Sequence, residues 1–204
     1  MSFKFLFVAV IVLVSAAFAQ TTDTPFQVRY AANLNFGDSV INITNSGALG
    51  AGLAAGTSAS TTGAICANVY AFSPDEQMIS CCTCPVTPNG LVSLSAQRDL
   101  ISNTLTPAVP TSIVVKLLAS APVGGSCNAA APGAVAPGMV AWGSTLKAAP
   151  GGAYQVTETQ FAPATLSAGE LNRLTQLCTF INANGSGYGI CRSCRLGGLG
   201  GTRQ

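Results

Sequence analysis

The sequence predicts a mainly β protein: an antiparallel β-sandwich or barrel-like domain, followed by one C-terminal amphipathic α-helix and a disulfide-stapled tail. Three observations lead to this fold class. Short runs with period-two alternation of apolar residues fill the first two thirds of the chain, and one later segment repeats apolar residues with helical spacing. Eight cysteines occur in a chain that begins like an exported protein.

The first segment, residues 1–19, has the composition of a secretory signal peptide. Lys4 supplies positive charge, residues 5–14 are apolar, and residues 17–19 place small side chains where signal peptidase cleaves. The alternative is a transmembrane anchor, but an anchor needs about 20 apolar residues and polar residues follow here at once. We expect cleavage, and therefore a secreted or cell-envelope protein (extracellular or periplasmic) without a transmembrane segment.

Alternating apolar residues and β-branched side chains indicate the strands of a domain over residues 20–166. We expect them at residues 26–32, 39–44, 65–72, 77–84, 91–95, 112–119, 139–146 and 153–160. Turn residues rich in Gly, Pro, Asn and Asp separate these runs. Short strands without intervening helices favour an antiparallel sandwich or barrel over βαβ units.

The helix belongs to the C-terminal segment, residues 167–204. Ser167 and Glu170 form a capping box, in which the hydroxyl caps the first turn and the glutamate reaches back to the Ser167 amide. An apolar stripe follows at Leu171, Leu174, Cys178 and Ile181. Asn184-Gly185 ends the pattern, which predicts a helix over 168–183 that docks on the sheet with Cys178 pointing inward.

The cysteines form an even set in an exported chain, which predicts up to four disulfides. The candidates are Cys66, Cys81, Cys82, Cys84, Cys127, Cys178, Cys191 and Cys194. A hairpin with Phe72 opposite Gln77 would put Cys66 opposite Thr83, on the same face as Cys81, with Cys82 and Cys84 on the other face. This register favours a Cys66–Cys81 bridge.

A second bridge is expected to tie the tail to the helix, from Cys178 to Cys191 or Cys194. Two C-x-x-C segments, 81–84 and 191–194, leave two alternatives open. One is a four-thiolate zinc site, although the segments lie far apart for a zinc ribbon. The other is a redox dithiol, which needs a helix N-terminus that neither segment has. We favour structural disulfides.

The composition weighs against several classes of function. Only 8% of residues are charged and the formal net charge is +2, which gives little attraction for nucleic acid. The chain has no histidine, so it has no Ser-His-Asp triad, no Cys-His dyad and no imidazole metal site. No catalytic, cofactor-binding or metal-binding residue is predicted, and no cofactor.

Two weaker signals remain. A carboxylate pair could serve a hydrolase, but the sequence nominates no pair among its seven acidic residues. Trp142, with Tyr154 or Tyr70, could form a stacking platform for a sugar. A single tryptophan on a strand is more often part of a core.

Three stretches, 81–90, 99–107 and 189–198, resemble segments of a group of uncharacterised exported bacterial proteins that contain cysteines. The resemblance implies a bacterial envelope or extracellular setting and brings no activity with it.

These observations lead to three hypotheses for function. The first is a non-enzymatic secreted or cell-surface protein with a structural or adhesive role, since near-zero net charge favours association with copies of itself or with an extracellular matrix. The second is an extracellular module that binds carbohydrate or another ligand through Trp142. The third is a carboxylate-dependent hydrolase.

Overall fold

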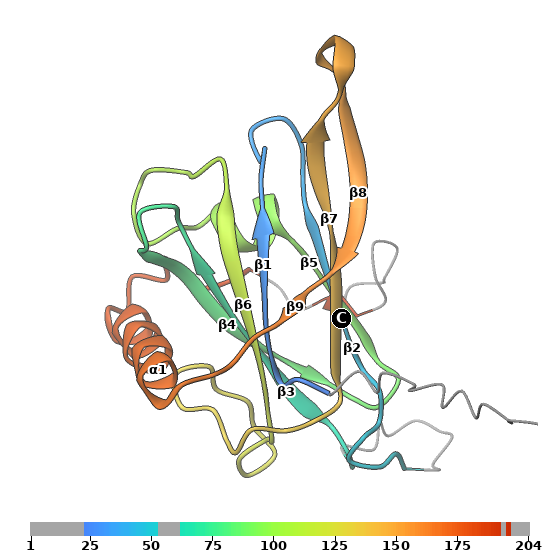
Figure 1. The fold of residues 1–204 in the computed structure, drawn as a ribbon. Helices are drawn as coiled ribbons and strands as arrows, with labels where there is room; N and C mark the ends of the chain where they lie inside the picture. The colour runs from blue at the N-terminus through green and yellow to red at the C-terminus, as the bar shows by residue number, and fades with distance from the viewer. Residues whose placement is uncertain (1–22, 53–61, 193–194, 197–204) are drawn as a thin grey trace, which may run out of the picture.

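The computed structural model describes residues 23–52, 62–192 and 195–196 (Figure 1). The predicted signal peptide, residues 1–19, and Cys194 lie outside these ranges. The strands are β1 (Phe26–Ala31), β2 (Val40–Asn45), β3 (Ile65–Phe72), β4 (Met78–Val86), β5 (Leu91–Ser95), β6 (Ile113–Ser120), β7 (Met139–Ala148), β8 (Tyr154–Gln160), β9 (Ala162–Pro163) and β10 (Arg195–Leu196). The helical segments are α1 (Ala168–Ala183) and the short turns η1 (Ala96–Ile101) and η2 (Pro150–Gly152).

The described strands form two antiparallel sheets rather than a closed barrel. The first sheet has the order β4-β3-β6-β1-β9, and the second has the order β10-β5-β2-β7-β8. Their facing side chains form one apolar core, to which β2 contributes Ile41 and Ile43 and β6 contributes Val115 and Leu117. The predicted β-sandwich is therefore confirmed.

Helix α1 makes a third layer on the outer face of the first sheet (Figure 1). Its predicted stripe is correct, because Leu174, Cys178 and Ile181 are buried against Tyr70 and Phe72 of β3. This layer explains why every residue of β3 is buried, since the strand faces the other sheet on one side and the helix on the other.

The start of α1 follows the prediction only in part. Ser167 Oγ accepts a hydrogen bond of 3.0 Å from the Glu170 amide, as a capping serine does. The Glu170 carboxylate, however, binds Lys116 Nζ of β6 at 2.6 Å, and the expected bond to the Ser167 amide is wrong. The opposite charge on the underlying strand is a stronger partner than a neutral amide.

All eight predicted strands are present, each with ends within two residues of those expected. The register of the β3–β4 hairpin differs from the prediction by two residues, because Cys66 pairs with Pro85 rather than with Thr83. An irregularity beside Phe72 shifts the ladder near the turn. A two-residue shift keeps every side chain on its expected face.

The short elements β9, β10 and η1 were not predicted. Strand β9 forms where the chain leaves the second sheet after β8 and pairs with Gln27 and Val28 of β1 in the first. Two residues carry no readable periodicity, so only the nearby free edge of β1 makes them a strand.

Candidate functional site

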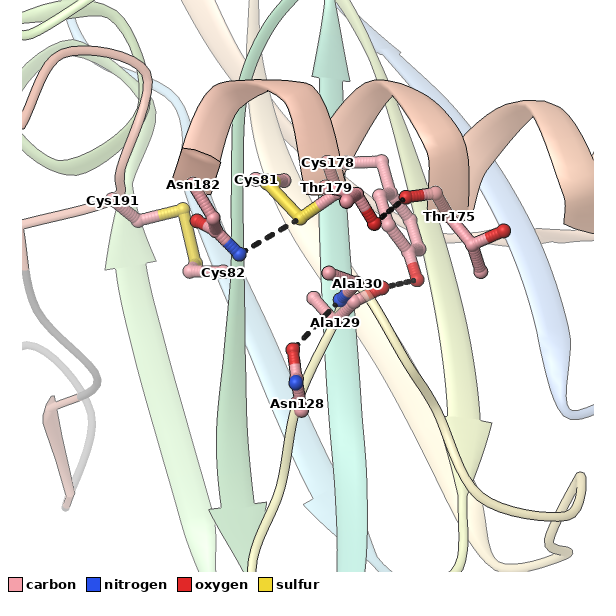
Figure 2. Close-up of a disulfide and its surroundings, with 11 residues drawn as sticks. Cys81, Cys82, Asn128, Ala129, Ala130, Thr175, Cys178, Thr179, Asn182 and Cys191 are labelled. Carbon is pink, nitrogen blue, oxygen red and sulfur yellow. Dashed lines mark hydrogen bonds between the residues drawn. A yellow bond between two sulfur atoms is a disulfide. The ribbon is translucent and has the colours of Figure 1, made fainter. Parts of the chain in front are cut away.

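Three disulfides join segments that lie far apart in the sequence. They are Cys66–Cys127, Cys81–Cys178 and Cys82–Cys191. Cys84 is disulfide-bonded as well, and none of the described cysteines is free. The adjacent cysteines of β4 point in opposite directions, so that Cys81 holds α1 and Cys82 holds the chain after α1 (Figure 2).

The faces of these cysteines were predicted correctly, but the bridges were not. Cys81 lies under α1, on the outer face, while Cys84 belongs to the core between the sheets. Cys81 pairs with Tyr70, four positions along β3 from Cys66. Four strand residues span about 13 Å, far more than a disulfide can bridge, so the Cys66–Cys81 prediction is wrong.

The expected bridge from Cys178 to the tail is wrong for a related reason. The buried stripe of α1 lies over β4 and brings the Cα atom of Cys178 to 5.8 Å from that of Cys81. Cys191 instead meets Cys82, with a Cα–Cα distance of 5.4 Å. The tail is stapled as expected, but to the sheet rather than to the helix.

This region does not offer the chemistry of the two C-x-x-C alternatives. Cys81, Cys82 and Cys84 of the first segment and Cys191 of the second are disulfide-bonded, so they supply no thiolate for zinc or redox exchange in this form. The bridges line a hollow of about 290 Å³ under α1. The hollow is lined by five bridged cysteines together with Thr83, Asn128, Ala129, Asn182 and Ile190, which fits a staple.

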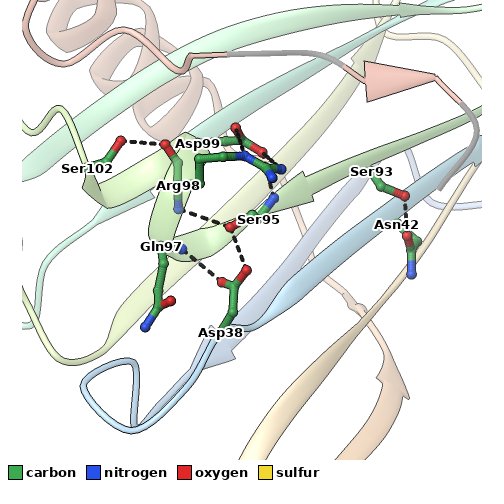
Figure 3. A network of polar contacts seen from close by, with 8 residues as sticks. All are labelled: Asp38, Asn42, Ser93, Ser95, Gln97, Arg98, Asp99 and Ser102. Atoms are coloured by element: carbon green, nitrogen blue, oxygen red, sulfur yellow. Dashed lines mark hydrogen bonds and ion pairs between the residues drawn. The ribbon is translucent and has the colours of Figure 1, made fainter. Parts of the chain in front are cut away.

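A polar network surrounds Ser95 at the start of η1 (Figure 3). Asp38 accepts hydrogen bonds from Ser95 Oγ at 2.5 Å and from the Gln97 amide at 2.9 Å. The Asp99 carboxylate accepts a hydrogen bond of 2.7 Å from the Ser95 amide and two hydrogen bonds of 3.1 Å from the Arg98 guanidinium. The hydrogen bond to Asp99 raises the pKa of the Arg98 guanidinium.

The fold brings the carboxylates of Asp38 and Asp99, 61 residues apart in sequence, to the same residue, Ser95, and pattern reasoning missed this pair. Asp99 is only 1% exposed, and both of its oxygens are engaged by Ser95 and Arg98. The pair satisfies backbone and side-chain donors of Ser95 and Gln97 around η1. This geometry serves the turn and leaves little access for a substrate.

Trp142 is half-buried on the outer face of the second sheet, where it pairs with Asn42 and Gln160. The predicted stacking partners lie elsewhere. Tyr70 is buried under α1 and donates a hydrogen bond to the Ala129 carbonyl, while Tyr154 stacks on Phe36 at 4.5 Å. Tyr154 pairs with Ala148, about 20 Å along β7 from Trp142, so no joint platform forms.

A pocket of about 320 Å³ opens where β8 runs into β9. Asp23, Gln27 and Gln160 contribute polar groups to it, and Val140 and Phe161 contribute apolar surface. Gln160 pairs with Trp142 on β7, so the tryptophan neighbours a lining residue, but Trp142 itself does not line the pocket. The sequence contained no signal for this pocket, since its lining comes from both ends of the sandwich domain.

The most exposed feature of the second sheet is its edge strand β8, which pairs only with β7 among the described strands. From the first sheet, Arg29 reaches across to β8 and donates to the Thr159 carbonyl at 2.5 Å and to Thr159 Oγ1 at 2.7 Å. Burial lowers the pKa of Arg29, while Glu158 acts in the opposite direction. This arginine holds β8 in place from the inside.

The other long edge, that of β4, is covered in part. Along β4, the Cys81 amide donates to the Gly189 carbonyl at 2.8 Å, and Ile190 lies beside Cys81 as a parallel bridge. At the far side of the first sheet, β9 has two residues, and Pro163 has no amide hydrogen. Among the described strands, β8 is therefore the longest uncovered edge.

No protein family, curated protein or solved structure matches this chain. Among the described residues, no helix is long and apolar enough to cross a membrane.

Proposed function

We propose that this is an exported, disulfide-stabilised structural or adhesive protein without enzymatic activity, which acts at or beyond the cell surface by associating with copies of itself. The observation that carries the proposal is the uncovered edge of β8 on a body of very low charge. The resemblance to exported bacterial proteins in residues 81–90, 99–107 and 189–198 adds support for an envelope or extracellular setting.

Export is supported by the cysteines and by the leader sequence. Disulfides form and persist in oxidising compartments, and seven of the eight cysteines are disulfide-bonded in the described part of the chain. The composition of residues 1–19 is that of a secretory signal peptide. Both features suit a protein that functions outside the cytoplasm.

Self-association is supported by what β8 lacks. Natural proteins protect long edge strands with charges, bulges, prolines or a covering segment, because unpaired backbone groups recruit other strands. Strand β8 has seven residues and one charged side chain, Glu158, and Val156 is 68% exposed. With a formal net charge of +2, little repulsion opposes contact between copies.

The experiment is size-exclusion chromatography with light scattering on residues 20–204, purified without reductant, over a concentration range from micromolar to millimolar. We expect the mean mass to rise with concentration. A strictly monomeric protein at the highest concentration contradicts the proposal.

The pocket next to Trp142 favours a second candidate function, an extracellular module that binds a carbohydrate. An aromatic face beside carboxylate and amide groups is the combination that recognises the apolar faces and hydroxyls of sugars. A glycan array tests it, with Trp142→Ala expected to abolish any binding. Phe36→Ala is the matched control, since Phe36 is an exposed aromatic residue in the loop between β1 and β2 and stacks on Tyr154, far from the pocket. An array that is silent for the unmodified protein removes this candidate.

A further inference from the structure

We infer that two copies of the chain associate by antiparallel pairing of their β8 strands about a two-fold axis at Thr157, with Val156 of each copy opposite Glu158 of the other. The inference rests on the proposed self-association and specifies its geometry. It follows from the direction of the backbone groups of β8 and from the order of its side chains.

The outward backbone groups of β8 can be identified from the bonds at the two ends of the β7–β8 ladder. The Phe161 amide donates to the Ala141 carbonyl, and the Ala149 amide donates to the Ala153 carbonyl. Hydrogen-bonded and non-hydrogen-bonded pairs alternate in an antiparallel ladder. The odd-numbered residues of β8 therefore face β7, and the amides and carbonyls of Tyr154, Val156, Glu158 and Gln160 point away from the sheet.

These outward groups are accessible to a second strand. Among the described strands, β8 has no neighbour on this side. The β7–β8 hairpin also extends beyond the body of the sandwich (Figure 1), so the approach along much of the strand is open. A second copy of the same edge is self-complementary, because an antiparallel pair of identical strands obeys two-fold symmetry.

Three registers join outward groups to outward groups near the middle of β8. Placing Glu158 opposite Glu158 sets like charges against each other, which destabilises a ladder, and it makes about six hydrogen bonds. Placing Val156 opposite Val156 also makes about six hydrogen bonds and leaves Gln160 unpaired. The register centred on Thr157 makes about eight, and pairs Tyr154 with Gln160 and Val156 with Glu158.

The inner side of the strand favours the same register. Thr157 would lie opposite Thr157 at a non-hydrogen-bonded position, where Cα atoms approach to about 4.5 Å and a Thr–Thr pair is favourable. Glu158 would face an apolar side chain, so no charge meets a like charge. This leaves Val156 as the position at which the register can be tested by charge.

The test compares Val156→Lys with Val156→Glu by sedimentation equilibrium of residues 20–204. In the two-fold symmetric dimer, the lysine of each copy would lie opposite Glu158 of the other copy, which makes two pairs of opposite charge. We therefore expect the Kd of the dimer to fall about three- to tenfold. A glutamate would meet the same carboxylates, and we expect the Kd to rise by a similar factor. Val140→Lys and Val140→Glu are the controls, since Val140 is 40% exposed on the same sheet face but lies on the internal strand β7.

The outcomes separate this inference from the proposed function. If both Val156 variants weaken the dimer, the two valines face each other and the register is overturned. A second outcome is a self-associating protein whose Kd neither Val156 variant changes, or whose Kd the Val156 variants change no differently from the Val140 controls. Either result overturns the pairing of β8 strands while self-association stands. A protein that is monomeric in all forms overturns the proposed function together with the inference.

Discussion

Removal of the Cys81–Cys178 bridge is expected to destabilise the protein less than its span of 97 residues suggests. The perturbation is the double substitution Cys81→Ala and Cys178→Ala. In the sequence, Cys82 follows Cys81 directly, and Cys191 follows Cys178 by thirteen residues, so the Cys82–Cys191 bridge joins nearly the same two segments. With that bridge in place, the unfolded chain already has these segments joined, and Cys81–Cys178 closes a ring of only about 15 residues.

The magnitude follows from the size of that ring. A loop of about 15 residues contributes about 3 kcal/mol to the free energy of unfolding in the chain-entropy model, against about 4.7 kcal/mol for a loop of about 100 residues. Both cysteines are 1% exposed, so the lost sulfur atoms leave a small cavity that costs about 1 kcal/mol more. We expect a total loss of about 4 kcal/mol.

The assay is urea unfolding without reductant, followed by circular dichroism and by fluorescence of Trp142. The control is the double substitution Cys66→Ala and Cys127→Ala. It removes a bridge with a sequence separation of 61, whose loop is not shortened by the Cys82–Cys191 bridge. Its loss is expected to be about 4 kcal/mol from the ring alone. A loss below about 2 kcal/mol for the Cys81 and Cys178 variant, or above about 5 kcal/mol, would refute the shared-ring reasoning, because an independent loop of about 100 residues with the same cavity would cost about 5.7 kcal/mol.

Three further predictions concern α1 and the sheet beneath it. Burial raises the pKa of Tyr70 above its usual value near 10, so this residue's contribution to the free energy of unfolding is intact below pH 10 and falls above it by up to about 1.4 kcal/mol per pH unit. Urea unfolding between pH 9 and 11 should therefore show a flatter decline for Tyr70→Phe. Tyr188→Phe, at a 56% exposed site, should leave the decline unchanged. Leu174→Ala should lower the free energy of unfolding by about 2 to 5 kcal/mol, whereas Phe180→Ala, at a 62% exposed site on the same helix, should lower it by well under 1 kcal/mol. Similar losses for the two variants would contradict the assignment of the face by which α1 docks on the sheet. Ser167→Ala should cost about 1 kcal/mol by the same assay, and no loss would show that the Ser167 hydroxyl does not cap the helix.

Local patterns explain why the elements were predictable. Strands β1 to β8 carry alternation or β-branched residues over five or more positions, and α1 carries both a cap and an apolar stripe. These signals depend on neighbours in sequence, which each segment contains by itself. The two-residue strands and η1 have no such signal, because partners elsewhere in the chain create them.

Side-chain partnerships were less predictable than elements. The face of Cys81 followed from alternation, whereas its partner depended on where α1 docks. Glu170 was expected to bind locally and binds Lys116 of a distant strand instead. Asp38 and Asp99 meet at Ser95 because β2 and β5 are neighbours in the second sheet, a pairing order that periodicity does not encode.

The sequence alone therefore determined the class of fold, the position of nearly every regular element and the faces of the cysteines, because backbone periodicity and capping act over a few residues. Only the tertiary structure decided the disulfide partners, the pocket beside Trp142 and the uncovered edge of β8. Each of these depends on the order of strands and on the docking of α1, which arise from burial of apolar surface over the whole chain.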